Sequence, residues 1–217
     1  MIEIHPIEGI KKIVKGDDLG LLIGKKLNTF TPITDQDVLV VASKVISKSR
    51  GRITKLDSKT TKQSIVEQES KRIIRQKDNL IISETKHGFI CANAGVDESD
   101  TDEGYAILLP NDIDSAAYAL HHSINAAFNI SIPVIISNAF TRPFRKGKTS
   151  VALGLYGIKT FSSSSVAIAD ELASTAELVM QKSSGICAAL VRGIPTSYLG
   201  NGKASDYIRN PNEELFR

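Results

Sequence analysis

The hydrophobic positions of this chain predict an alternation of buried strands and amphipathic helices. Continuous apolar segments, typical of strands buried on both faces, lie at residues 37–42, 132–137 and 186–192. The apolar segment 151–158 is interrupted by glycines, which indicates a strand in close contact with other backbone. Apolar and polar side chains alternate over residues 2–6, as in an exposed or edge strand.

Helical spacing predicts three helices between these strands. The segment Gly16-Asp17-Asp18 offers a cap for the first, whose apolar face is formed by Leu19, Leu21, Leu22, Ile23 and Leu27. The other two helices cover residues 112–129, with Asp114 or Ser115 near the cap, and 166–180.

The middle of the chain is more polar. Residues 57–78 have few apolar positions, which predicts an exposed helix or a mobile flap. Two strands are expected at 80–83 and 88–93, joined by a polar link. Because strands and helices alternate irregularly, we expect an α/β (α+β) fold of mixed β-sheets with flanking helices, in a single domain covering residues 1–217.

Composition excludes several classes of protein. The 217 residues are 41% hydrophobic and 24% charged, as in an ordinary soluble protein. A net charge of +3 and the absence of Trp argue against nucleic acid as the main partner. No apolar segment approaches the roughly 18 residues that span a bilayer, and the N-terminus lacks signal-peptide features. Cys91 and Cys187 lie in apolar segments, as reduced buried thiols do, so we expect a cytoplasmic protein.

Three polar segments carry candidate chemistry. Ser43, Lys44, Ser47 and Lys48 follow the predicted strand 37–42 directly. Cations and hydroxyls at the end of a strand suit a phosphate chain, although the order of a Walker loop is missing. A solvated basic loop or helix is the alternative.

The second segment is acidic. Five carboxylates occur within seven residues after the predicted strand 88–93, at positions 97, 98, 100, 102 and 103. Oxygen ligands of this kind coordinate hard cations, but the order of an EF-hand is missing. A solvated acidic loop is the alternative.

The third segment is cationic, with Arg142, Arg145, Lys146 and Lys148 after another buried strand. A cradle for a carboxylate or phosphate is one interpretation, and a surface loop is the other.

These segments, in their order along the chain, resemble the family of coenzyme F420-0:L-glutamate ligases (F420:gamma-glutamyl ligases), of which this chain looks like a divergent member. The most specific motif is Asp37-Val-Leu-Val-Val-Ala-Ser-Lys-Val-Ile-Ser-Lys48 followed by Gly51-Arg52. Asn93-Ala-Gly-Val-Asp97, the segment 142–147 and Val191-Arg-Gly193 follow in the family's order. The resemblance covers essentially the whole chain.

The resemblance implies a cytoplasmic homodimer that acts as an amide ligase, uses GTP and requires Mg²⁺ or Mn²⁺. In such an enzyme the nucleotide phosphorylates the carboxylate of an anionic acceptor, and the amine of L-glutamate then displaces phosphate. By matching position, the nucleotide-binding residues are Ile10, Ile13, Ser43, Lys44, Lys48 and Asp100. Asp97 and Asn138 correspond to metal ligands, and we assign Arg142 and Arg145 to anionic substrate. No catalytic residue is assigned.

The chain departs from the family pattern around the later strand. Where the family has an aspartate, a Thr or Ser and a glycine, this chain has Asn138, Ala139 and Thr141. An amide oxygen still binds magnesium but brings no charge, so weaker metal binding is expected. A family segment is also missing near residues 161–165, and the glycine-rich nucleotide loop is reduced at residues 181–187.

Three hypotheses therefore remain open at the level of the sequence. The first is a ligase that adds L-glutamate to coenzyme F420-0 or a related acceptor. The second is the same chemistry applied to folate. The third is a protein of the same fold that has lost catalysis and serves as a nucleotide-binding or assembly protein.

Overall fold

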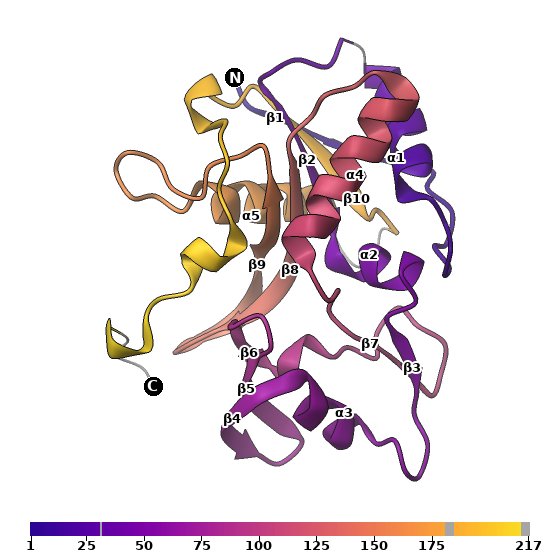
Figure 1. Ribbon diagram of the computed structural model, residues 1–217, viewed down its shortest axis with the longest axis vertical. Helices are drawn as coiled ribbons and strands as arrows, with labels where there is room; N and C mark the ends of the chain where they lie inside the picture. The colour runs from indigo at the N-terminus through magenta and orange to yellow at the C-terminus, as the bar shows by residue number, and fades with distance from the viewer. Residues whose placement is uncertain (31, 181–184, 214–217) are drawn as a thin grey trace.

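A mixed five-stranded sheet forms the centre of the computed structural model, which describes residues 1–30, 32–180 and 185–213 (Figure 1). In spatial order its strands are β1 (Glu3–Pro6), β10 (Ala188–Arg192), β2 (Asp37–Ala42), β8 (Val134–Arg142) and β9 (Arg145–Tyr156). β2 and β8 are parallel, and the other neighbours are antiparallel. The mixed α/β architecture matches the prediction, and each of these strands overlaps a predicted one, with β1 at an edge; β8 and β9 are longer than predicted.

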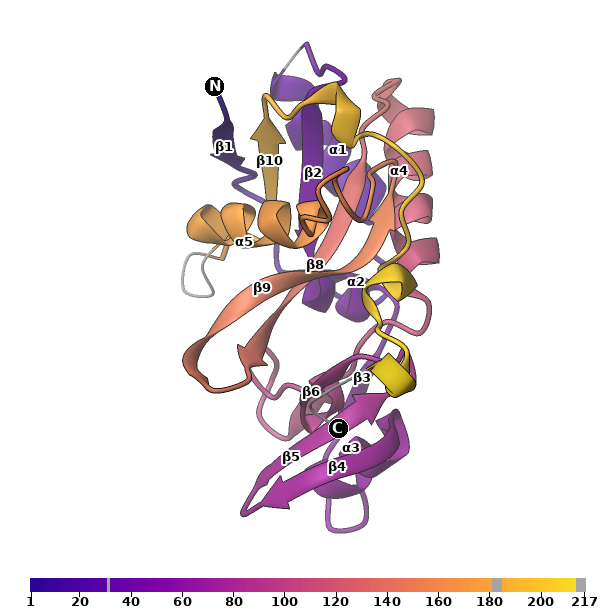
Figure 2. The same cartoon turned by 90° about the vertical axis from the view of Figure 1, so that its left-hand side faces the viewer.

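Helices cover both faces of this sheet. α1 (Leu19–Leu27) and α4 (Ile113–Phe128) lie on one face, and α5 (Ile168–Met180) lies on the other (Figure 2). The side chains of β2 alternate between the two layers, because successive residues of a strand point to opposite faces. Leu39 and Val41 join the core beneath α1 and α4, whereas Val38 and Val40 join the core beneath α5. β2 is thus buried on both faces, as its apolar run predicts.

α1 and α4 pack closely. A Cβ atom at Gly20 would lie 1.9 Å from Ser123 Oγ of α4, so a side chain there has no room. Asp18 caps α1 as predicted, because its Oδ1 accepts hydrogen bonds from Leu21 N at 3.1 Å and from Ser123 Oγ at 3.2 Å. Leu21, however, is 50% exposed, so its predicted place on the apolar face of α1 is wrong.

The prediction of one exposed helix or flap over residues 57–78 is wrong in its second half. The helix α3 (Lys62–Glu69) ends there, and β4 (Ser70–Lys77) begins. β4 pairs with β5 (Leu80–Thr85), which pairs with β6 (Ile90–Ala92). A polar segment becomes a strand here because β5 supplies hydrogen-bond partners that its own side-chain pattern does not reveal.

Short elements complete the chain. α2 (Ser43–Ser49) follows β2 directly, and β3 (Ile53–Lys55) pairs with β7 (Tyr105–Ile107), two strands that the sequence pattern did not predict. The 3₁₀ turns are η1 (Asn28–Phe30), η2 (Asn93–Gly95), η3 (Thr196–Tyr198), η4 (Ala204–Tyr207) and η5 (Pro211–Glu213). No helix in the described ranges has the length and apolar character needed to cross a membrane.

The interpretation of residues 142–150 as a loop is wrong. β8 and β9 form a continuous hairpin whose turn is Pro143–Phe144, and its cations stand on the two strands next to that turn. Phe144 has a φ of 58° and is 91% exposed at the tip. The paired backbone of the two strands holds this segment extended, beyond the layers of the core (Figure 2).

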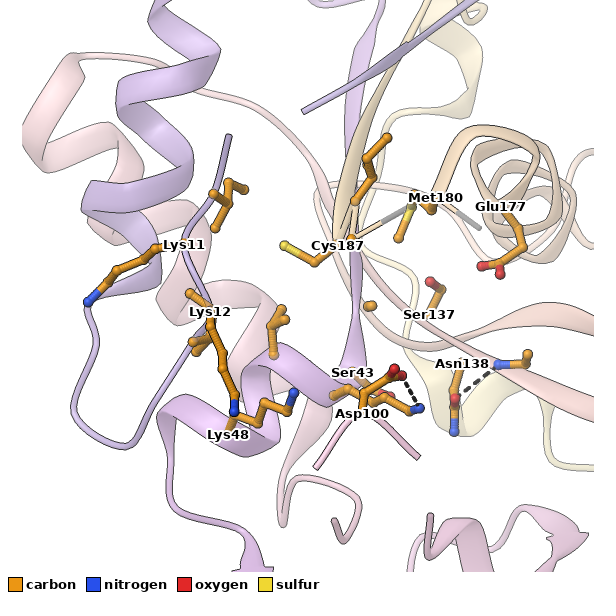
Figure 3. A pocket seen from close by; sticks show the side chains of 18 residues that line it. Lys11, Lys12, Ser43, Lys48, Asp100, Ser137, Asn138, Glu177, Met180 and Cys187 are labelled. Atoms are coloured by element: carbon orange, nitrogen blue, oxygen red, sulfur yellow. Dashed lines mark hydrogen bonds and ion pairs between the residues drawn. The ribbon is translucent and has the colours of Figure 1, made fainter. Parts of the chain in front are cut away.

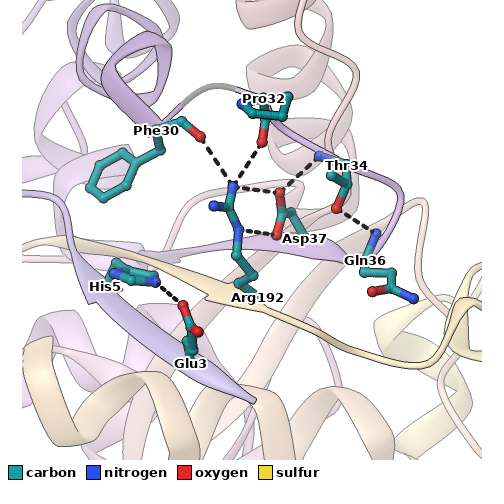
Figure 4. Close-up of polar contacts among 8 residues, drawn as sticks. All are labelled: Glu3, His5, Phe30, Pro32, Thr34, Gln36, Asp37 and Arg192. Atoms are coloured by element: carbon teal, nitrogen blue, oxygen red, sulfur yellow. Dashed lines mark hydrogen bonds and ion pairs between the residues drawn. The ribbon is translucent and has the colours of Figure 1, made fainter. Parts of the chain in front are cut away.

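An ion pair with a buried carboxylate joins the start of β2 to the end of the neighbouring strand β10 (Figure 4). The Asp37 side chain at the start of β2 has 0% exposure, and it accepts Arg192 Nε at 2.8 Å and Arg192 Nη2 at 2.9 Å. The same Nη2 donates to the carbonyl oxygens of Phe30 and Pro32. The hydrogen bond to Asp37 is the main cause of the raised pKa of Arg192. The ion pair therefore fixes the strand β10, the strand β2 and the connection before β2 to one another.

Both cysteines are free thiols, and burial gives Cys91 a testable pH dependence. Burial raises the pKa of the Cys91 thiol to about 12. An unfolded thiol titrates near pH ~8.5, so the unfolded chain loses its proton first and the free energy of unfolding falls as the pH rises between these values. Between pH 8 and pH 10 we expect Cys91 to account for a loss of about 2 kcal/mol. Urea unfolding at the two pH values should show a loss smaller by that amount in Cys91→Ala, and equal losses in both proteins would contradict the argument.

Candidate functional site

The main candidate site lies where the parallel strands β2 and β8 end. Their carboxyl ends meet at one edge of the sheet, with Ala42 paired to Ser137. In open α/β sheets this edge is the usual place for a ligand, because the chain diverges beyond it and leaves a crevice. A cavity of about 390 Å³ opens here, a size typical of small-molecule sites (Figure 3).

Four lysines line part of this cavity. Because α2 starts directly after the last residue of β2, Lys44 and Lys48 stand one helical turn apart on the side of the cavity. Lys11 and Lys12 come from the segment between β1 and α1. Figure 3 shows Lys11, Lys12 and Lys48 on the same side of the cavity. Lys11 pairs with Asp17 at 2.6 Å and Lys12 with Asp102 at 3.1 Å, and Lys44 is paired with two carboxylates. Lys48, which has no ion pair among the described residues, is the cation most open to an anion such as a phosphate group.

The rest of the cavity is largely apolar. Its apolar lining comes from four segments of the chain and comprises Ile10, Ile13, Val45, Met180, Ile186 and Cys187. The Cys187 carbonyl accepts a hydrogen bond from Ala42 N at 2.9 Å, which holds the approach to β10 against the end of β2. An apolar wall beside a group of cations matches a ligand that has both a ring system and charged groups.

A left-handed turn brings Asp97 to the edge of this site. Asn93, Ala94 and Gly95 have positive φ values of 53°, 51° and 75°. For a buried alanine this conformation costs about 1–3 kcal/mol, and such strain concentrates at functional sites. The backbone of Asp97 then pairs with Ile107 in both directions, at 3.0 Å and 2.8 Å. The position of the Asp97 carboxylate is therefore fixed by its backbone.

Lys44 ties the acidic loop to α2. Its Nζ lies 2.9 Å from Asp97 Oδ2, 2.7 Å from Asp100 Oδ2 and 2.6 Å from Ser99 Oγ. Burial acts to raise the pKa of Asp97, but hydrogen bonds from Ser99 and Lys44 outweigh it and hold the pKa far below its usual range. Burial likewise acts to lower the pKa of Lys44, and the hydrogen bonds to Asp100 and Asp97 raise it overall. These groups are charged at neutral pH.

The pKa of Lys48 is lowered, whereas that of Lys44 is raised. Burial is the main cause of its lowered pKa, and repulsion from Lys44 and Lys12 adds to the effect against an attraction to Asp100. A cation that its surroundings disfavour gains from an incoming anion. Lys48 is therefore the side chain best placed to gain from a phosphate oxygen.

The predicted metal pair shares one small recess. A space of about 10 Å³ beside the main cavity is lined by both Asp97 and Asn138, together with Ser43, Lys44 and Ser47. Among the described residues no three His, Cys, Asp or Glu side chains form a metal-binding group. Magnesium is often held by only one or two carboxylates and by phosphate oxygens. Asp97 Oδ2 is paired with Lys44 and Asn138 Oδ1 accepts a hydrogen bond from Ala139 N at 3.0 Å, so these two oxygens fit a hard cation only together with the oxygens of a bound polyphosphate.

The structure brings together most of the residues that the sequence singled out. Ile10, Ile13, Ser43, Lys44, Lys48, Asp100 and Asn138 all line the main cavity, and Asp97 lines the adjoining recess. Arg142 and Arg145 line neither; they lie on the β8–β9 hairpin, where Arg142 Nη2 donates to Lys146 O at 2.8 Å. Their binding of substrate stays a prediction. Of the reduced loop at 181–187, residues 181–184 lie outside the described residues.

Sequence reasoning missed several residues that line the cavity: Lys11, Lys12, Ser137, Glu177, Met180 and Cys187. Lys11 and Lys12 lie between Ile10 and Ile13, two predicted nucleotide contacts, so the sequence could have indicated them as cavity residues. Glu177 could also have been noticed, because Asp170, Ser174 and Glu177 form a polar row at helical spacing beside the apolar face of α5.

Comparison with known proteins places these features in context. The model of the family described as F420-0:Gamma-glutamyl ligase matches residues 9–193. The coenzyme F420:L-glutamate ligase of Methanothermobacter thermautotrophicus is 35% identical over 249 aligned positions, which cover 100% of this chain and 99% of that protein. The protein of the same name from Methanocaldococcus jannaschii is 38% identical over 86% of each chain, and that from Archaeoglobus fulgidus is 32% identical over 100% of this chain and 96% of its own.

Proposed function

This chain belongs to the F420-0:gamma-glutamyl ligase family, and we propose that it joins the amine of L-glutamate to a carboxylate of a coenzyme F420-0-type acceptor. The product is an amide, so the enzyme is a ligase that forms a C–N bond. The observation that carries the proposal for this chain is the joint position of Lys44, Lys48 and the Asp97–Asn138 recess at one cavity.

GTP and Mg²⁺ or Mn²⁺ belong to the proposal. GTP supplies the phosphoryl group that activates the acceptor carboxylate, and the cation neutralises the phosphate charge. On this chain Asp97 and Asn138 hold the cation, while Lys44 and Lys48 bind phosphate oxygens. Asp100 keeps the Lys44 ammonium in place through their 2.7 Å ion pair. The apolar side chains Ile10 and Ile13 flank the nucleoside.

These residues act mainly by position and charge. An ammonium held between two carboxylates costs little reorganisation when a phosphate approaches, which favours electrostatic stabilisation of the reaction. Arg142 and Arg145 are proposed to attract anionic substrate from the hairpin. A homodimer that works in the cytoplasm is also part of the proposal, as the family resemblance implies.

The proposal is tested by product formation. The purified protein is incubated with GTP, Mg²⁺, L-glutamate and coenzyme F420-0, and the acceptor is examined by mass spectrometry. We expect a mass increase of one glutamyl residue that depends on each component. Conversion of a folate acceptor alone would favour the folate hypothesis, and no conversion with GTP still bound would favour a protein without catalysis.

Asn138 offers a prediction on metal affinity. In Asn138→Asp a carboxylate replaces the amide beside Asp97, and an added negative charge strengthens the binding of a hard cation. We expect Mn²⁺ to bind about tenfold more tightly in the presence of a GTP analogue, measured by calorimetry or electron paramagnetic resonance. Thr141→Asp is the matched control, because it adds the same charge to the exposed part of the same strand. An equal gain in both variants would contradict the assignment of Asn138.

A further inference from the structure

Glu177 is a carboxylate that lines the cavity and has no assigned role. It lies on α5 and is half-buried, and Figure 3 shows its carboxylate on the far side of the cavity from Lys11, Lys12 and Lys48. The other carboxylate that lines the cavity, Asp100, is paired with Lys44. Among the described residues Glu177 makes no such ion pair.

The Glu177 side chain is nevertheless held in a defined position. Ser150 Oγ donates to Glu177 Oε2 at 2.9 Å, and Ser150 is buried in β9. Ser174 Oγ, one helical turn before Glu177, donates to the Ser150 carbonyl at 2.7 Å, and it also pairs with Thr149 Oγ1 at 3.0 Å. This network fixes α5 against β9, so Oε2 is anchored, whereas Oε1 has no hydrogen-bond partner among the described residues.

The charge pattern indicates what that ligand group is. An ionised carboxylate only accepts hydrogen bonds, and its strongest partners are cationic N–H donors. Lys12 and Lys48 lie on the opposite side of the cavity, where ammonium groups suit the anionic part of a ligand. A ligand that spans the cavity therefore has anionic groups near the lysines and an N–H cation near Glu177.

We propose that Glu177 binds the α-ammonium group of the incoming L-glutamate and so orients the nitrogen that enters the amide bond. This inference rests on the proposed function, because only in that reaction is an amino acid a substrate. Ser150 acts as the positioning residue, since it touches Glu177 and not the substrate.

The experiment compares Glu177→Gln with the wild-type protein in the ligation assay. Gln keeps the size of the side chain and the hydrogen bond from Ser150 but removes the charge that binds an ammonium group. We expect the KM for L-glutamate to rise roughly 10- to 100-fold, while the KM for GTP and the melting temperature stay unchanged. Glu171→Gln is the control, because Glu171 lies exposed on the first turn of the same helix.

Glutarate, a glutamate analogue without the amine, provides a second control. Glutarate has the two carboxylates of glutamate and lacks the amine, so it should inhibit the wild-type protein and Glu177→Gln equally. An unchanged KM for L-glutamate in Glu177→Gln would overturn the inference while leaving the proposed function intact. A rise in the KM for GTP or in the Mg²⁺ requirement, in place of the KM for L-glutamate, would also overturn it. If the wild-type protein forms no glutamyl product, the proposed function fails and the inference fails with it.

Discussion

Replacing Asp97 by alanine is expected to lower glutamate-dependent release of phosphate from GTP by at least about 10³-fold. Asp97 is the only charged oxygen ligand in the recess that it shares with Asn138, as far as the described residues go. Its loss removes the carboxylate that we propose binds the cation and, among the described residues, leaves Lys44 with one carboxylate partner, Asp100. The rate of phosphate release at saturating GTP measures the effect.

The neighbouring residue provides the control for this variant. Glu98 is also an acidic residue of the same loop, but it pairs with Lys62 at 2.8 Å, outside the cavity lining. Glu98→Ala should therefore keep nearly full activity. Thermal unfolding of Asp97→Ala should show a folded protein, and retention of wild-type turnover in this folded variant would exclude Asp97 as a metal ligand.

The second large effect concerns stability. Arg192→Ala leaves the Asp37 carboxylate, which has 0% exposure, without its cation. Breaking a buried ion pair by removing one partner costs about 3–5 kcal/mol, because an uncompensated charge stays inside the protein. Arg192→Ala also leaves the carbonyl oxygens of Phe30 and Pro32 without this donor. Urea unfolding should therefore show a loss of that size.

The partly exposed ion pair between Lys62 and Glu98 provides the control for Arg192→Ala. Lys62 and Glu98 are both partly exposed, so Lys62→Ala should cost less than about 1 kcal/mol. Equal losses in Arg192→Ala and Lys62→Ala would show that the buried pair contributes no more than a surface contact.

The sequence predicted those parts of the fold whose signal is local. β2 is buried on both faces because its side chains from Val38 to Ala42 are apolar, and Asp18 caps α1 through its own short side chain. β4 was missed because only its pairing with β5 makes residues Ser70–Lys77 a strand. The β8–β9 hairpin was missed for the same reason, since a dense group of cations does not reveal whether the backbone is paired.

Some residues of the candidate site could be predicted from the local sequence, and others could not. Lys44 and Lys48 follow a recognisable strand, so their presence at the edge of the sheet could be expected. The placement of Asp97 beside Asn138 depends on the left-handed turn at residues 93–95, and only the family resemblance anticipated it. Glu177 is positioned by Ser150, a distant residue on another element, so the polar row on α5 could mark its face of the helix but could not place its carboxylate in the cavity.

A crystal structure with a non-hydrolysable GTP analogue and Mn²⁺ tests the central claim most directly, namely that this cavity is a nucleotide and metal site. We predict phosphate density against Lys44 and Lys48 and an anomalous manganese peak between Asp97 and Asn138. Nucleotide bound elsewhere on the protein, or nucleotide in the cavity without a manganese peak beside Asp97, would contradict the account.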